Sequence, residues 1–263
     1  MSRNKIESAY LDIMNTEYNG SEIWKQFNQN NTNIPLTASV AFKGNQYDDC
    51  NLKLMVVGRA INGWETDFST CCTVNDVTNT VLDQDFSFSD VINENGFPRE
   101  GKRPYRYITS KFWKLIKYIL EEYGEANAEW YDKSKNMNWN EKIVWSNLYK
   151  VSPRYEKNPD DHLIQKTIEG NIEIIKAEIA EYRPKIILFV TDKWYLEPSD
   201  KIPSFAKALN IQFMNDGSHD TVVGYGMYGD SKIIVCKRPD IWGYTDQKVK
   251  AMSKEIKEAF DEI

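Results

Sequence analysis

The chain has few of the residues that zinc-binding and disulfide-bonded proteins use. Only two of its 263 residues are histidine and four are cysteine. Cys71 and Cys72 are adjacent, and neighbouring cysteines cannot form an ordinary unstrained disulfide. No Cys-x-x-Cys pair or histidine-rich segment occurs, so a zinc site made of thiolates or imidazoles has little support. We therefore expect reduced thiols and no metal or cofactor, although a magnesium site made only of carboxylates stays open.

Long apolar segments are also missing. The longest uninterrupted aliphatic or aromatic run is Ile186 to Val190, far below the roughly 18–20 residues that span a bilayer. No long apolar stretch follows the basic residues Arg3 and Lys5, as it would in a secretory signal. The sequence therefore predicts a cytoplasmic protein without a membrane segment.

Positive charge is in deficit. The chain has 33 lysine and arginine residues against 39 aspartate and glutamate residues, a net charge of −6. Non-specific affinity for duplex DNA comes largely from neutralising phosphates. The sequence thus argues against a protein that coats long duplex DNA, while a local basic mouth around a short segment stays compatible with it.

The apolar residues that are present predict a parallel sheet. Four short runs rich in β-branched and aromatic residues read as buried strands, at residues 52–58, 142–148, 185–190 and 232–236. Helical stripes of apolar residues occupy 108–123, 168–182 and 249–263. Strands separated by helices imply right-handed crossovers and a sheet covered on both faces.

The expected fold is α/β, a three-layer α/β/α sandwich with a central four-stranded mainly parallel sheet. We expect residues 1–263 to form one domain. In it, residues 1–51 would make one or two short helices and an asparagine-rich loop, residues 28–33, packed on the sandwich.

A glycine-rich segment, Gly224 to Gly229, literally matches the dinucleotide-binding fingerprint. That motif needs a strand before it and a helix after it, so that helix amides face the pyrophosphate. Here an apolar strand follows instead. The segment is therefore predicted to be a hairpin and not a nucleotide-binding loop.

The binding site is expected where the parallel strands end. In open parallel sheets, ligands bind outside the carboxyl ends of the strands, where loops and helix N-termini converge. The segments that follow the four predicted strands are rich in polar, cationic and aromatic residues, and they cover residues 58–64, 147–153, 191–194 and 237–244.

The order of these segments resembles the uracil-DNA glycosylase superfamily. The first strand leads into residues 58–62, Gly-Arg-Ala-Ile-Asn, and the second ends near Asn147. Pro-Lys-Ile-Ile-Leu follows at residues 184–188, and Arg-Pro-Asp at residues 238–240. The resemblance extends from Leu52 to Tyr244. It implies a glycosylase-like fold and a DNA-repair chemistry in which a base is flipped out, stacked on a ring and read by an amide.

The resemblance also implies roles for individual residues. Asn147 would read the base, because a fixed amide can complement the O4 and N3–H groups of uracil. Phe68 would supply the stacking ring. The other substrate-binding candidates are Gly58, Arg59, Ala60, Asn62 and Trp242, and the phosphate-binding candidates are Lys150, Ser152 and Arg154.

The chain departs from the superfamily pattern at two positions. Ala60 stands where active members generally have Asp or Asn to orient a water, and Arg238 where they have a histidine that stabilises the departing base. Arginine can stabilise an anionic base as a permanent cation but cannot transfer a proton at neutral pH. Glu65 or Asp67 can replace the missing acid, so the catalytic candidates are Arg238 and Glu65.

These departures leave three functions open. The first is a glycosylase that acts on a base in single- or double-stranded DNA or in a nucleotide. The second is a catalytically inactive module of the same fold that binds nucleic acid or nucleotides. The third is a hydrolase of free nucleotides or another small metabolite, since the architecture alone does not determine function.

Overall fold

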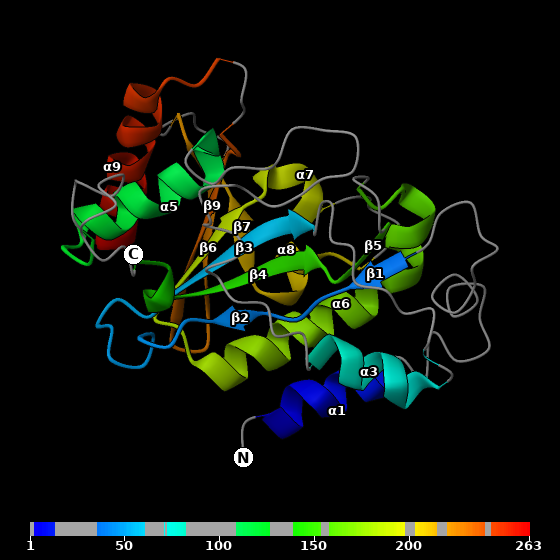
Figure 1. Ribbon diagram of the computed structural model, residues 1–263. Coiled ribbons are helices and arrows are strands. Elements are labelled where there is room, and N and C mark those ends of the chain that lie inside the picture. Colours follow the sequence, from blue (N-terminus) through cyan, green and yellow to red (C-terminus); the bar gives the residue numbers. More distant parts are fainter. Residues whose placement is uncertain are drawn as a thin grey trace.

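A computed structural model shows a mixed α/β fold with a mainly parallel central sheet (Figure 1). It describes residues 3–13, 36–60, 71, 73–82, 109–126, 139–153, 158–197, 203–214, 220–239 and 243–263. The four predicted strands are present as β3 (Leu54–Ala60), β4 (Ile143–Tyr149), β6 (Ile186–Val190) and β9 (Ser231–Cys236). They lie in the order β4-β3-β6-β9, and each neighbouring pair is parallel.

The sheet is wider than the four strands predicted. Three further strands pair antiparallel at its two edges, and the full order is β2-β4-β3-β6-β9-β8-β7. The added strands are β2 (Phe42–Lys43), β7 (Ile211–Phe213) and β8 (Val222–Tyr228). β2 and β7 have only two or three residues, too few for a period-two pattern to stand out in the sequence.

Residues 1–51 also contribute more than the predicted helices. The described part contains α1 (Arg3–Ile13), as expected, but also β1 (Leu36–Ala38) and the edge strand β2. β1 forms a separate two-stranded sheet with β5 (Val151–Pro153). The asparagine-rich segment 28–33 lies outside the described residues.

The glycine-rich segment is a hairpin, as predicted. β8 contains Gly224 and Gly226, and it pairs antiparallel with β9. Gly229 lies in the connecting turn at φ 58°, a left-handed conformation that glycine adopts without steric cost. A strand therefore follows the glycines, where a dinucleotide-binding loop would need a helix.

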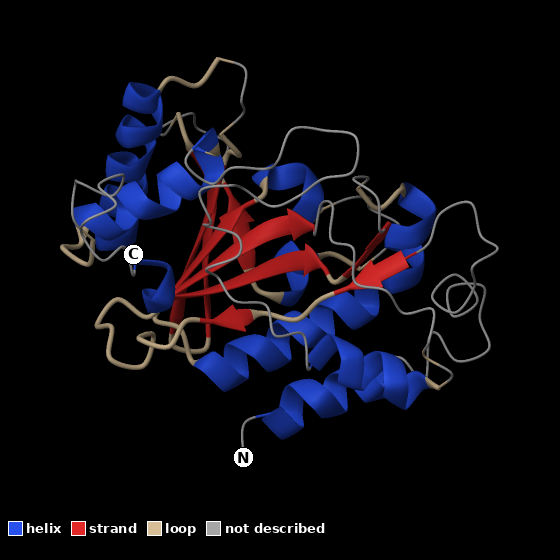
Figure 2. Cartoon of the chain, viewed as in Figure 1, coloured by secondary structure: helices blue, strands red, loops and turns tan. Residues whose placement is uncertain are grey.

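Helices cover both faces of the sheet (Figure 2). α5 (Lys111–Glu122) and α9 (Asp246–Glu262) pack on one face, and α6 (Asp161–Tyr182), α7 (Asp192–Leu196) and α8 (Phe205–Ala208) on the other. Alternate residues of β3 belong to different cores: Leu54 faces the first group and Met55 the second. α1, α3 (Val74–Leu82) and the outer side of α6 form a third apolar cluster.

The ends of α6 follow from local sequence. Asp160 caps its start, because the side chain accepts a hydrogen bond of 2.8 Å from the amide of Leu163. The helix ends at Arg183, which is left-handed at φ 47°. Pro184 follows and cannot continue the helical hydrogen-bonding pattern. The apolar stripe predicted over residues 168–182 ends at the same point of the chain.

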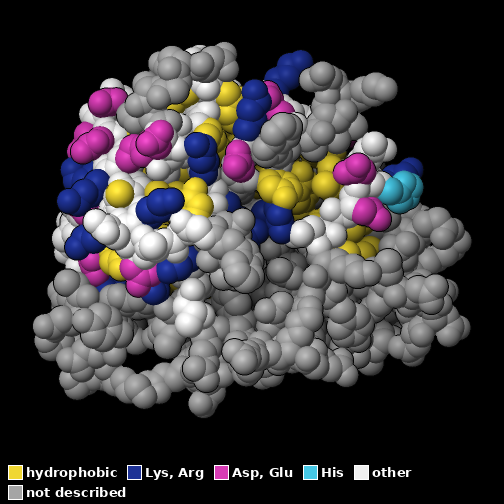
Figure 3. All heavy atoms as spheres, turned by 90° about the horizontal axis from the view of Figure 1, so that it is seen from above, with side chains coloured by type: hydrophobic (Ala, Val, Ile, Leu, Met, Phe, Trp, Pro, Cys, Tyr) yellow, Lys and Arg dark blue, Asp and Glu magenta, His cyan; other side chains and the backbone are white. Residues whose placement is uncertain are grey.

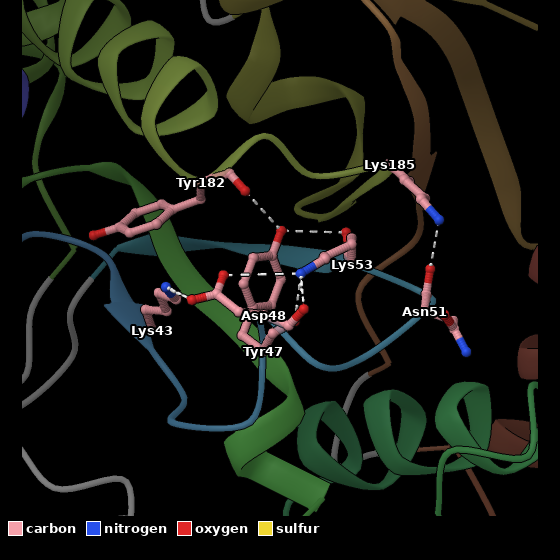
Figure 4. Close-up of polar contacts among 7 residues, drawn as sticks. All are labelled: Lys43, Tyr47, Asp48, Asn51, Lys53, Tyr182 and Lys185. Carbon is pink, nitrogen blue, oxygen red and sulfur yellow. Dashed lines mark hydrogen bonds and ion pairs between the residues drawn. The ribbon is translucent and has the colours of Figure 1, made fainter. Parts of the chain in front are cut away.

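Polar contacts close the amino-terminal edge of the parallel strands (Figure 4). The Tyr47 hydroxyl lies 3.3 Å from the carbonyl oxygen of Tyr182 and 3.4 Å from that of Lys53. The ammonium groups of Lys53 and Lys185 donate to the carbonyls of Tyr47 and Asn51, at 3.0 Å each. The side chains of Tyr47, Lys53 and Lys185 thus hold the loops at this edge in place.

Candidate functional site

The carboxyl edge of the parallel strands brings three predicted motifs together. Ala60 is the last residue of β3, Asn147 lies near the end of β4, and Arg238 comes two residues after β9. The carboxyl ends of parallel strands lie at the same edge of the sheet. Only β6 separates β3 from β9, so their backbones are about 10 Å apart at ~4.8 Å per strand.

Asn147 is a buried amide beside a glycine. Its exposed fraction is 5%, and it pairs in register with Gly58 of β3. A methyl group on Gly58 would lie 2.6 Å from the Asn147 Oδ1 atom, so the amide rests where a side chain would otherwise be. β3 continues for two residues beyond Gly58, so the glycine does not end the strand.

The Asn147 side chain makes no hydrogen bond with any other described residue. It follows Ile143 and Trp145 in the alternation of β4, on the face covered by α5 and α9. Buried polar groups are nearly always hydrogen-bonded. The amide groups of Asn147 are therefore left unused by the described residues and can serve a ligand.

Arg59 lies on the opposite face of β3. Its Nη1 donates to the hydroxyl of Tyr195, and its Nη2 donates to Oδ1 of Asn158. The guanidinium also stacks on Tyr195, with its carbon 4.6 Å from the ring centroid. Tyr195 is anchored in turn, because its carbonyl accepts a 3.0 Å bond from the hydroxyl of Tyr149.

Lys150 and Ser152 lie in the protein interior. Neither side chain is exposed to a phosphate in solvent, so the predicted phosphate contacts are wrong. Lys150 is fully buried, and its Nζ lies 2.7 Å from both carboxylate oxygens of Glu178. Burial lowers the pKa of Lys150, and Glu178 opposes this effect. Ser152 is fully buried in β5, opposite Thr37 of β1. The Lys150 ammonium therefore pairs with a carboxylate instead of a phosphate, and the Ser152 hydroxyl is closed off from solvent without a hydrogen-bond partner among the described residues.

Five predicted site residues lie outside the described part of the chain: Asn62, Glu65, Phe68, Arg154 and Trp242. Their roles stay predictions. Arg238 is described and exposed at the strand edge.

This edge also carries an acid that the sequence patterns did not single out, Asp192. It follows β6, the strand between β3 and β9, and it has a left-handed backbone at φ 65°. Non-glycine residues rarely adopt this conformation, although Asp and Asn do so more often. Burial is the main cause of the raised pKa of Cys236, and Asp192 adds to it, so its carboxylate lies near the end of β9. Its position directly after a predicted strand was the available signal.

No family model matches this chain, and no curated protein matches it. The described ranges hold no cluster of three or more His, Cys, Asp or Glu side chains able to share a metal ion.

The surface charge is mixed. On the face drawn in Figure 3, lysine and arginine side chains alternate with aspartate and glutamate side chains over the described atoms. Among the described residues, no helix is both long and apolar enough to cross a membrane.

Proposed function

We propose that the protein is a divergent uracil-DNA glycosylase-like protein that binds a nucleobase, in DNA or in a nucleotide, at the ends of β3 and β4. The observation that supports this is the buried amide of Asn147, which rests on Gly58 and bonds to no other described side chain. An amide offers one acceptor and two donors. Its N–H can donate to O4 of uracil while its oxygen accepts N3–H.

We extend the proposal to hydrolysis of the N-glycosidic bond. A water oxygen forms a bond to C1′, and the C1′–N bond breaks with its electron pair moving to the base. Arg238 would stabilise the departing anion as a permanent cation. Asp192 would accept the proton of the water, in place of the acid that Ala60 lacks. Glu65 stays the alternative acid from the sequence analysis.

The alternative is a binding module of the same fold without turnover. Ala60 favours it, because alanine has no polar group with which to orient a water. The two functions share the Asn147 amide and differ only in the chemical step.

Incubation of the protein with single- and double-stranded oligonucleotides that contain uracil or hypoxanthine distinguishes the glycosylase from the binding module. We expect abasic sites, detected by alkaline strand cleavage. Asp192→Asn should abolish the product and preserve binding. Binding without any abasic product would support the binding module instead of the glycosylase. If the protein neither bound these oligonucleotides nor produced abasic sites, the proposal would be refuted.

Replacing Asn147 with Ala should weaken the binding of deoxyuridine by about 2–6 kcal/mol, because two buried hydrogen bonds are lost at about 1–3 kcal/mol each. Titration calorimetry measures the change. Asn79→Ala is the matched control, because Asn79 is exposed on α3 and its substitution should leave the affinity unaltered. Equal affinities of the Asn147→Ala variant and the unmodified protein would rule out Asn147 as the base-reading amide.

A further inference from the structure

Arg59 is a cation whose partners are all neutral. Within the described part of the chain it forms no ion pair, and it bonds only to Tyr195 and Asn158. Many of the lysines differ in this respect. Carboxylates pair with Lys43, Lys53, Lys111, Lys114, Lys117, Lys142, Lys150, Lys176, Lys193 and Lys257. A half-buried guanidinium without a counter-charge has the chemistry of an anion receptor.

The guanidinium is also held in position before any ligand arrives. The Tyr195 ring supports its plane, and each terminal nitrogen uses one of its two N–H groups. Each terminal nitrogen therefore keeps one donor, and a planar pair of donors matches two oxygens of a phosphate. Nε is closed off from solvent and has no hydrogen-bond partner among the described residues. Because the side chain is already ordered, binding costs little further conformational entropy.

The charges around Arg59 partly favour an anion. Asn158 lies just before α6, a helix of 22 residues whose amino terminus carries partial positive charge. The opposing groups are two exposed carboxylates: Asp160, which caps α6, and Asp161 in its first turn. Burial raises the pKa of Tyr149; among the smaller effects Arg59 lowers it and Asp161 raises it, so both charges lie near this tyrosine. Asp161 forms no ion pair with Arg59 within the described ranges.

The two faces of β3 separate this site from the Asn147 amide. Gly58 and Arg59 are consecutive, so they face opposite sides of the sheet. A ligand that contacts both sites must therefore carry a second group besides its base. We propose that Arg59 binds a phosphate group of a base-bearing ligand, either a free nucleotide or DNA. This inference rests on the proposed function in one respect, namely that the phosphate belongs to a ligand that also carries a base.

Calorimetry with three probes tests the assignment: inorganic phosphate, deoxyuridine and deoxyuridine 5′-monophosphate. We expect Arg59→Gln to bind the monophosphate roughly ten- to a hundredfold more weakly, because a charge-assisted contact is lost. Its affinity for deoxyuridine should not change. Arg59→Lys should be intermediate, since it keeps the charge without the planar fork. Lys254→Gln, which removes an exposed charge from α9, is the matched control and should bind all three as before.

An oligonucleotide arm distinguishes the two sources of phosphate. If the phosphate belongs to DNA, the dependence of log affinity on log salt should become shallower by about 0.7–0.9 in Arg59→Gln. If it belongs to a free nucleotide, that slope should stay the same while affinity for the monophosphate falls.

Either of two results would overturn the assignment: unchanged affinity of Arg59→Gln for both phosphate-bearing probes, or an equal loss in Lys254→Gln. Thermal unfolding of each variant shows whether its fold is kept, and Arg59→Lys provides the comparison if the glutamine variant is unstable. Phosphate binding that depends on Arg59, with no binding of deoxyuridine, would refute base reading and leave the anion site in place.

Discussion

Glu178→Gln is expected to lower the free energy of unfolding by about 3–5 kcal/mol, because it leaves a fully buried ammonium without its counter-charge. The Glu178 carboxylate accepts hydrogen bonds from the Lys150 ammonium, the Ser146 hydroxyl at 2.7 Å and the Ala41 amide at 2.9 Å. It thus ties α6 to β4 and to the segment before β2. Urea denaturation at neutral pH measures the loss.

The loss should depend on pH. Burial lowers the pKa of Lys150, and Glu178 is the group that opposes this shift. Without Glu178 the folded-state pKa falls further below the usual 10.5 of the unfolded chain. Between the two values the unfolded state binds more protons, so stability rises with pH. We expect Glu178→Gln to approach the stability of the unmodified protein as pH rises through this window.

Two controls make this prediction specific. The double replacement Lys150→Met with Glu178→Gln should recover most of the loss, because no charge is left unpaired and the glutamine oxygen can still accept from the Ala41 amide. Glu173→Gln breaks the Lys176–Glu173 pair on the outside of the same helix, where the Glu173 side chain is 60% exposed. That change should cost no more than about 0.5 kcal/mol. Equal stabilities of Glu178→Gln and Glu173→Gln would contradict the buried-pair explanation.

Gly58→Ala should abolish base binding while leaving the protein folded. The new methyl group would lie 2.6 Å from Oδ1 of Asn147, and the next nearest atoms are at 3.7 Å. The end of a side chain can turn away at little cost, so the free energy of unfolding should change by less than about 1 kcal/mol. The displaced amide would leave the buried polar groups of the base unmatched, a loss of about 2–6 kcal/mol in binding for two such groups. Calorimetry with deoxyuridine measures it.

Gly226→Ala is the contrasting control. Its methyl group would lie 2.6 Å from the backbone oxygen of Asn210, which has no rotamer to change. We expect this variant to lose stability, while the site at the carboxyl ends of β3 and β4 stays unaffected. If Gly58→Ala bound deoxyuridine as the unmodified protein does, Asn147 would not be the base-reading amide.

The chain's local patterns were sufficient for the centre of the fold. Apolar runs and helical stripes predicted β3, β4, β6 and β9 and the helices α5, α6 and α9, all of which the structure confirms. They failed for β2 and β7, which are too short to carry a pattern of their own. Such strands form because a long neighbour offers unpaired backbone groups, and this is a property of the assembled sheet.

The sequence by itself determined which residues follow the parallel strands, because strand ends can be read from local hydrophobicity. Only the tertiary structure decided what those residues do. Arg59 and Lys150 are both cations at the end of a predicted strand, and nothing local separates them. Lys150 meets Glu178, which lies 28 positions along the chain, inside the protein, whereas Arg59 meets the neutral side chains of Tyr195 and Asn158 within the described residues. The pairing of a charge depends on which distant segments pack beside it, and packing is not encoded within any single segment.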